Sequence, residues 1–324
     1  MPRGSLEALA ADSNFPALKL ATDGAFILSC LGGGEAASGV SALRGIEVLN
    51  HKPGRRSTLR YDLLAGDSEF CVIGKWYRDA PQARRMHALH STLQAAELCL
   101  PRPLYSGDEG LFLEELVPGR ELRELVFETD TTPFGEAGRW LAALHSSQPP
   151  AGLKHKSLRH EIDKASAWGR EVAEAVPEWE GAVQATLRGM MRQAEQMEPA
   201  MPALIHRDYY PANLLWDGRA LWAVDFDQAA IGDPAVDAGT FLGQLEKVAI
   251  RDSVEPAAFE RQAGAFLDAY SGLSGARLGL RLPFFTAYTF LKLTAAEIAR
   301  RRPRWRELAG AYLSRAGEEA ARSA

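Results

Sequence analysis

The pattern of apolar and polar positions divides the chain into a β-rich front and a mostly helical back. Near the start, a short apolar run over residues 25–30 ends in three glycines. Strand-like runs follow at residues 45–49, 58–63 and 70–75, separated by turns rich in proline, glycine and aspartate. This pattern predicts an antiparallel meander of three strands.

Helical spacing takes over after the third strand. Apolar residues recur at helical intervals from Pro81 to Leu100, and Pro101 ends the predicted helix. A further short strand is expected at residues 111–116, and the rest is helical except for a compact β segment between residues 203 and 226. This order predicts an α+β chain of two lobes with a cleft between them, where ligands tend to bind.

Composition restricts the class of protein. The chain has 324 residues, of which 46% are hydrophobic and 24% charged, with a net charge of −5. These values are typical of a globular protein and argue against a dedicated nucleic-acid binder. Three widely spaced cysteines form neither a disulfide framework nor a zinc site. Because no long apolar run or signal peptide stands out, we expect no membrane partner and a cytoplasmic location.

The densest chemical signal lies at residues 206–227. Asp208 is expected in a loop, Asn213 at the start of a strand, and Asp225 at the end of the next strand of the same hairpin. Two oxygen ligands from neighbouring strands suit a hard cation such as Mg²⁺. A nearby carboxylate can orient an attacking hydroxyl or accept its proton, so the segment holds the parts of a phosphoryl-transfer site.

These motifs resemble the kinase superfamily in its small-molecule branch, the aminoglycoside phosphotransferase and choline kinase family. The resemblance rests on HxDxxxxN at 206–213, VDFD at 224–227, GDPAVD at 232–237 and Leu-His-Ser at 144–146. The order of predicted elements matches the family over nearly the whole chain.

The resemblance implies a two-lobed protein-kinase-like fold. Residues 1–112 would form a nucleotide-binding lobe and residues 113–117 a hinge. Residues 118–324 would form a helical lobe that holds the catalytic loop, the metal site, the acceptor site and an inserted helical region.

The resemblance also implies a role for each matching residue of the helical lobe. Asp208 would be the catalytic base or would position the acceptor hydroxyl. Asn213 and Asp225 would hold Mg²⁺ ions that bridge the phosphates of ATP, and Asp237 would be a structural acid beneath the catalytic loop. Asp227 is either a further metal ligand or a capping acid at a turn.

The nucleotide would be held mainly by the front lobe. Lys75 would pair with the α- and β-phosphates, the loop at residues 52–57 would cover the nucleotide, and the linker at residues 113–116 would hold adenine through its backbone. The residues predicted to bind ATP are Lys75, Gly54, Arg55, Ser57, Glu114 and Leu116.

Three features depart from the family pattern. The nucleotide loop lacks GxGxxG, and its one glycine is followed by two arginines that either contact phosphates or are merely solvated. The helix after the third strand has no glutamate in its middle to pair with Lys75, which leaves Glu97 near its end as the candidate. Arg207 stands where this branch commonly has glycine. A protein kinase is disfavoured, because Tyr210 replaces the lysine of those enzymes and too few residues follow the metal motif to dock a peptide.

The acceptor is less well defined. Residues 251–324 hold 12 basic and 8 acidic residues, and the basic residues include five arginines between residues 300 and 306. This excess favours a neutral sugar, a polyol or an anionic metabolite over a polycation, unless the arginines simply end a helix before Pro303. Trp168 and Trp179 either stack on a sugar ring or only pack.

We therefore predict an ATP- and Mg²⁺-dependent kinase that phosphorylates a hydroxyl of a small molecule, as a monomer or homodimer. The alternative from another class is a catalytically silent nucleotide-binding regulator, suggested by the missing helix glutamate and the unusual nucleotide loop.

Overall fold

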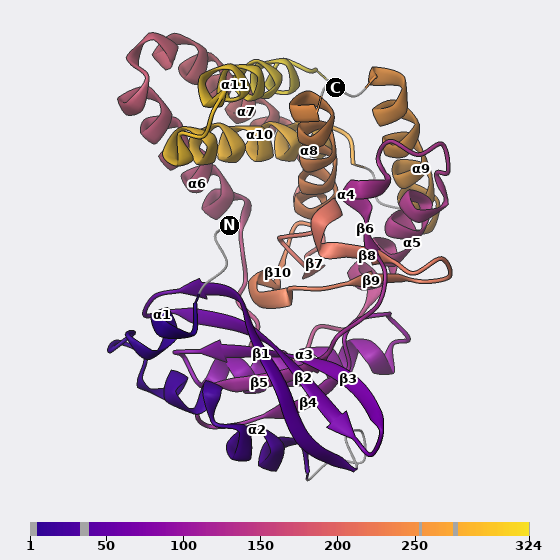
Figure 1. The fold of residues 1–324 in the computed structure, drawn as a ribbon. Coiled ribbons are helices and arrows are strands. Elements are labelled where there is room, and N and C mark those ends of the chain that lie inside the picture. Colours follow the sequence, from indigo (N-terminus) through magenta and orange to yellow (C-terminus); the bar gives the residue numbers. More distant parts are fainter. Residues whose placement is uncertain (1–4, 33–38, 253–254, 275–277, 324) are drawn as a thin grey trace. The chain divides into compact units, whose positions relative to one another are not determined.

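The computed structural model describes residues 5–32, 39–252, 255–274 and 278–323. The chain divides into two compact units, Met1–Pro118 and Gly119–Ala324, each with its own elements (Figure 1). Within the described ranges, no helix combines the length and the apolar character that a membrane span needs.

Unit 1 is built on a five-stranded antiparallel sheet in the order β1-β2-β3-β5-β4. Its strands are β1 (Val40–Lys52), β2 (Arg56–Ala65), β3 (Ser68–Tyr77), β4 (Pro103–Ser106) and β5 (Leu111–Glu115). The predicted three-strand meander is confirmed, with strands longer than the apolar runs indicated. Gly54, with φ +64°, makes the turn between β1 and β2, a conformation that favours glycine.

One face of this sheet packs against short helices at the start of the chain, α1 (Leu6–Ala10), η1 (Pro16–Thr22) and α2 (Gly24–Leu31). The apolar run at residues 25–30 is therefore helical, which differs from the β-rich pattern expected for the front of the chain. The Asp23 carboxylate accepts a hydrogen bond from the Phe26 N–H at 3.1 Å and begins α2. Ile27 and Leu31, one helical turn apart, are then buried against the sheet.

The other face of the sheet carries α3 (Pro81–Ala95) and the side chain of Lys75. Residues paired across neighbouring strands share a face, so Thr58 lies with Lys75 and Ser57 lies with Trp76 on the opposite side. Helix α3 ends at Ala95, earlier than the predicted end at Leu100. Glu97 therefore lies beyond the helix, with φ +62°.

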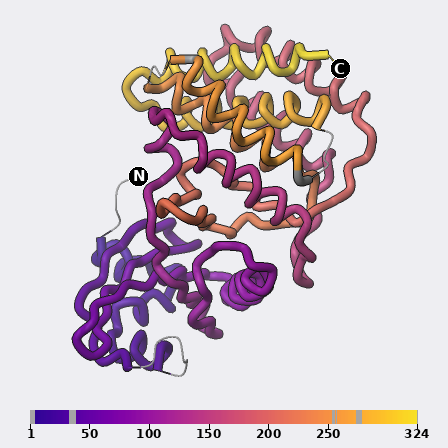
Figure 2. The backbone as a smooth tube through the Cα atoms, turned by 90° about the vertical axis from the view of Figure 1, so that its right-hand side faces the viewer, coloured from indigo at the N-terminus to yellow at the C-terminus, as the bar shows by residue number. Residues whose placement is uncertain are grey.

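Unit 2 is mainly helical, and Figure 2 shows its C-terminal helix running along α10. Its longer helices are α5 (Thr132–Ser146), α6 (Leu158–Ala175), α7 (Glu180–Gln196), α8 (Ala235–Asp252), α9 (Pro256–Ser274), α10 (Arg281–Arg300) and α11 (Trp305–Ala320). Phe284, Phe285 and Leu291 of α10 are fully buried in its main core. Gly239 lets α8 approach α10 closely, because a Cβ there would meet the Phe285 Cβ at 2.6 Å.

The remaining elements in the described part of unit 2 are short strands, turns and one short helix. They are β6 (Arg120–Glu121), α4 (Leu122–Leu125), η3 (Pro177–Trp179), β7 (Ala203–Ile205), η4 (Pro211–Asn213), β8 (Leu214–Trp216), β9 (Leu221–Ala223), η5 (Phe226–Gln228) and β10 (Ala230–Gly232). The predicted β8–β9 hairpin forms, and the Asp217 carboxylate accepts hydrogen bonds from the backbone N–H groups of Arg219 and Ala220 in its turn. The hairpin leaves Asn213 just before one strand and Asp225 just after the other.

Candidate active site

A buried carboxylate holds the loop that carries Asp208. Asp237 lies in the first turn of α8 and is fully buried. It accepts hydrogen bonds from the backbone N–H groups of His206 at 2.7 Å and Arg207 at 2.6 Å, and it lies 3.1 Å from Nε2 of His145. This geometry agrees with the structural role that the family resemblance implies for Asp237.

His206 is a structural residue of the same loop. Its Nε2 lies 3.1 Å from the Val224 carbonyl, and its Nδ1 lies 3.3 Å from the Asp208 backbone nitrogen. A neutral imidazole satisfies both contacts, with Nε2 as donor and Nδ1 as acceptor. Burial lowers the pKa of His206, although the carboxylates of Asp237, Asp208 and Asp225 act in the opposite direction. The ring is therefore held neutral and fixes the loop to the hairpin.

The backbone at Arg207 has a conformation that favours glycine, the residue that the family resemblance leads us to expect at this position. Its φ is +68°, a left-handed conformation that costs a residue with a side chain about 1–2 kcal/mol. Here the guanidinium pairs with the buried Glu161 carboxylate at 2.7 Å. The Tyr288 hydroxyl donates to the other oxygen of Glu161 at 2.6 Å. The loop that carries Asp208 is thus tied to α6 and α10.

The oxygen ligands predicted for Mg²⁺ follow the ends of the hairpin. Nδ2 of Asn213 donates to the Asp208 carbonyl at 3.0 Å, which leaves the amide oxygen as the group that can bind a cation. Asp225 has φ +65° and precedes η5, whose first turn holds Asp227. Within the described ranges, no group of three or more His, Cys, Asp and Glu residues forms a metal cluster. The donor set fits Mg²⁺, which takes one or two carboxylates and completes its shell with phosphates and water.

Asp208 lines a cavity of about 220 Å³ inside unit 2. Its side chain is 31% exposed, and its carboxylate lies 3.5 Å from the ammonium of Lys292 on α10. Lys164 and Trp168 of α6 line the same cavity, and Trp168 packs edge-on against Tyr288 with ring centroids 4.9 Å apart. Sequence reasoning missed both lysines. The one signal available was the spacing of Lys164 and Trp168, which places them on one face of a helix.

Trp179 and the arginine cluster at residues 300–306 are the two features for which the sequence left two interpretations open. Trp179 lies against Gly310 of α11 and not on the Asp208 cavity. The predicted arginine cluster lies where α10 ends, and its Arg301 and Arg306 flank the ring of Trp305. The basic residue that α10 brings to Asp208 is Lys292.

In unit 1, Lys75 is buried and paired. Its ammonium lies 2.7 Å from the carboxylate of Glu114, and the two residues are only 5% and 3% exposed. Glu97 as the partner of Lys75 was therefore wrong. Glu114 lies in β5, two residues along from Phe112, which pairs with Lys75, so both charged side chains share a sheet face. Glu114, which was predicted as a hinge residue, thus pairs with Lys75 in place of a glutamate from the helix.

Asp12 contacts the loop at residues 52–57, which is predicted to cover the nucleotide. The Gly54 N–H donates to the carboxylate of Asp12 at 2.7 Å. Nε2 of His51 lies 3.6 Å from the same carboxylate, and Nδ1 of His51 lies 2.7 Å from the Ser57 hydroxyl. Ser57 is fully buried on the face opposite Lys75, so its side chain is not directed to the same side as the lysine. Arg55 and Leu116 are exposed.

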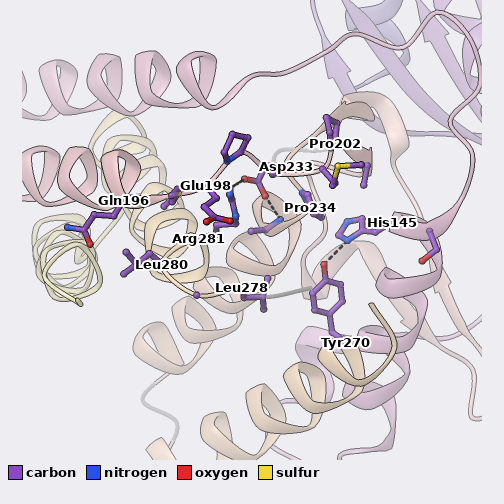
Figure 3. A pocket seen from close by; sticks show the side chains of 18 residues that line it. His145, Gln196, Glu198, Pro202, Asp233, Pro234, Tyr270, Leu278, Leu280 and Arg281 are labelled. Atoms are coloured by element: carbon purple, nitrogen blue, oxygen red, sulfur yellow. Dashed lines mark hydrogen bonds and ion pairs between the residues drawn. The ribbon is translucent and has the colours of Figure 1, made fainter. Parts of the chain in front are cut away.

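A larger cavity of about 640 Å³ lies elsewhere in unit 2 (Figure 3). His145 and Tyr270 point toward each other at one side of it and are 2.9 Å apart. Asp233 pairs with Arg281 at 2.6 Å and also accepts the Ala235 N–H at 3.0 Å. These polar groups pair with one another or with the backbone, whereas the smaller cavity contains Asp208, the residue predicted to be catalytic.

Known proteins share this architecture. The chain is similar to the solved structure of the amicoumacin kinase hAmiN in complex with AMP-PNP, Ca²⁺ and Ami, at 13% identity and a TM-score of 0.64, covering 94% of this chain and 96% of that chain. A putative aminoglycoside phosphotransferase from Ralstonia eutropha JMP134 is 14% identical, with a TM-score of 0.67 and coverage of 94% and 97%. Choline kinase from Cryptosporidium parvum is 12% identical, with a TM-score of 0.60 and coverage of 85% and 88%.

At these identities the likeness shows the fold, and the predicted kinase-like α+β class is confirmed. A search of the curated proteins found no match. The model of the phosphotransferase enzyme family (APH) matches residues 53–282, which run from the turn between β1 and β2 through the loop that carries Asp208 to the start of α10. The chain therefore belongs to the phosphotransferase enzyme family.

Proposed function

We propose that the protein transfers the γ-phosphate of ATP, in the presence of Mg²⁺, to a hydroxyl of a small molecule. The observation that carries this proposal is the position of Asp208. Its partly exposed carboxylate lines a cavity, while its loop is bonded to the Asn213 amide and fixed by the buried Asp237. Membership of the phosphotransferase enzyme family supports the reaction type.

Asp208 is proposed to act on the acceptor. Its carboxylate accepts a hydrogen bond from the acceptor hydroxyl and takes the proton as that oxygen forms a bond to the γ-phosphorus. The bond from the γ-phosphorus to its bridging oxygen breaks, and ADP leaves with the bonding electrons. Lys292, at 3.5 Å, restricts the orientation of Asp208. Such positioning of reacting groups can contribute roughly 7–11 kcal/mol of the barrier.

Asn213 and Asp225 are proposed to hold Mg²⁺, with Asp227 as a further candidate. When bound, the ion neutralises charge on the phosphates. Lys75 is proposed to contact the α- and β-phosphates, held in place by Glu114. This carboxylate partner weakens the case for a silent regulator, because that case relied on the absence of a partner for Lys75. The loop at residues 52–57 is proposed to cover the nucleotide, with Gly54, Arg55 and Ser57 as the predicted contacts.

The acceptor is proposed to be a sugar, a polyol or another metabolite instead of a polycation, because the described lining of the cavity includes Lys164, Arg207 and Lys292. Adenine is proposed to bind along the backbone of residues 113–116, including Glu114 and Leu116. We also retain the predictions that the protein acts in the cytoplasm, as a monomer or homodimer.

The test is ADP release from Mg²⁺–ATP across a panel of aminoglycosides, choline, amino acids, hexoses and polyols. Asp208→Asn is expected to abolish release while leaving nucleotide affinity nearly unchanged. Asp163→Asn, which alters an exposed carboxylate of α6, is the matched control and is expected to behave as the wild type. Undiminished release by Asp208→Asn would overturn the proposed role. Nucleotide binding without release for any acceptor would favour the regulator.

A further inference from the structure

The cavity that contains Asp208 has an excess of positive charge. Three cationic side chains, Lys164, Arg207 and Lys292, line it with Asp208. Glu161 neutralises Arg207 through a contact of 2.7 Å, and Asp208 lies 3.5 Å from Lys292. In the described part of the chain, no carboxylate forms an ion pair with Lys164. Of the three cations, Lys164 is therefore the one without a carboxylate in direct contact, although Glu161 attracts its ammonium from a longer distance.

Lys164 is held beside this cavity by its own helix. Its ammonium lies 5.7 Å from the centroid of the Trp168 ring, one turn along α6. Burial lowers the pKa of Lys164, and the positive charges of Arg207 and Lys292 lower it further, whereas the Glu161 carboxylate acts in the opposite direction. A cation in such surroundings gains more from a bound anion than an exposed lysine would, because both the burial and the neighbouring charges oppose its charged state.

We propose that the acceptor molecule carries an anionic group, either a carboxylate or a phosphate ester. Lys164 binds this group while the hydroxyl of the acceptor that receives the phosphate contacts Asp208. The inference rests on the proposed function and narrows its substrate class. Lys292 also lines this cavity and contacts Asp208, so it adds positive charge near both the anionic group and the hydroxyl of the acceptor. A cationic acceptor would meet like charge from both lysines.

The size and walls of the cavity limit the acceptor further. A volume of about 220 Å³ is below the roughly 300 Å³ at which pockets for drug-sized ligands begin. Trp168 and Tyr288 supply aromatic walls, and Gln228 and Thr240 supply neutral polar groups. The site thus fits a small hydroxylated anion better than a multi-ring aminoglycoside.

The experiment measures binding by calorimetry with Mg²⁺ and AMP-PNP present in saturating amounts, so that the nucleotide site does not take up the anions. The probes are two matched sets, glycerate, glycerol 3-phosphate and glycerol, and gluconate, glucose 6-phosphate and glucose. We expect at least one anion to bind about tenfold or more tightly than its neutral counterpart, since a charge-assisted contact contributes that much or more. The carboxylate and phosphate arms show which anion is preferred.

Two variants assign the binding to Lys164. Lys164→Gln is expected to lose the preference for the anion, whereas Lys164→Arg, which keeps the charge, is expected to retain it within about threefold. Lys154→Gln, at an exposed lysine outside the cavity, is the matched control and is expected to bind as the wild type does. Equal binding of anions by Lys164→Gln and wild type, an equal loss in both Lys164 variants, or no preference for anions in either set would overturn the inference.

The same experiment tests the proposed function separately. The protein is first titrated with Mg²⁺ and AMP-PNP, and absence of binding there would count against the nucleotide role. Anion binding at Lys164 is measured in the titration that follows. If the wild type binds AMP-PNP but shows no preference for anions, only the inference about the acceptor is overturned.

Discussion

Replacing Glu114 with glutamine removes the negative charge that faces the buried ammonium of Lys75. The change is nearly isosteric, so it alters charge with little change in volume. Both residues lie on one face of the sheet of unit 1, and their side chains are 7% and 4% exposed. Because water has little access, the lysine cannot recover its lost partner through solvation.

The size of the effect follows from the geometry. At 2.7 Å and an effective dielectric constant of about 20, the Coulomb attraction of the pair is about 6 kcal/mol. The cost of desolvating both groups offsets part of this, and breaking one partner of a buried pair typically costs about 3–5 kcal/mol. A glutamine oxygen still accepts a hydrogen bond from the ammonium, so we expect a loss near the lower end, about 3 kcal/mol.

The assay is urea unfolding of the wild type, Glu114→Gln, Lys75→Met and the double variant, which together isolate the coupling free energy of the pair. The matched control is Glu115→Gln at the next residue of β5. Glu115 pairs with Arg102 at 2.9 Å, but these side chains are 42% and 45% exposed, so the expected cost is below about 1 kcal/mol. A coupling free energy below about 1 kcal/mol, or equal losses for Glu114→Gln and Glu115→Gln, would refute the reasoning.

Two further predictions concern the nucleotide loop and pH. Asp12→Ala removes the acceptor of the Gly54 N–H. We expect the free energy of unfolding, measured in urea, to fall by about 2 kcal/mol, and the KM for ATP, measured by ADP release, to rise several-fold. The control Asp67→Ala, in the exposed β2–β3 turn, is expected to change neither quantity. Burial, aided by Arg251, lowers the pKa of Lys247 to about 8. Between that value and an unfolded value of about 10.4, only the unfolded state binds the proton, so stability rises with pH. Relative to Lys247→Met, urea unfolding should show the wild type gaining about 2 kcal/mol from about pH 7 to pH 10; parallel curves for the two proteins would contradict this.

Much of the fold could be predicted because it follows from local patterns. Alternating residues in β2 and β3 and the turn residues between them specify the meander, and the hairpin turn places Asn213 and Asp225 at neighbouring strand ends. The run at residues 25–30 was misread because a short apolar stretch has no resolvable period. Asp23 was the available signal, since aspartate often begins a helix.

The contacts that support the site were beyond local reasoning. The pair of Lys75 with Glu114 depends on the register of β3 against β5, which is set by tertiary packing. The contact of Asp12 with the nucleotide loop joins residues 42 positions apart. Likewise, the approach of Lys292 to Asp208 depends on how α10 packs in unit 2. Sequence motifs therefore indicated the candidate site residues, whereas the residues that contact them could be identified only from the packing of the structure.

The left-handed backbone at Arg207 has a consequence for how this protein diverges in evolution. With glycine at this position, the loop needs no compensation and the sequence of α6 can change freely. With arginine, the conformation is tolerated together with a buried charge that only Glu161, 46 positions away, neutralises among the described residues. Loss of either residue alone leaves a buried charge unmatched, so the two are expected to be inherited as a pair. Helix α6, which lines the cavity that contains Asp208, and the loop that carries Asp208 are thereby constrained to change together.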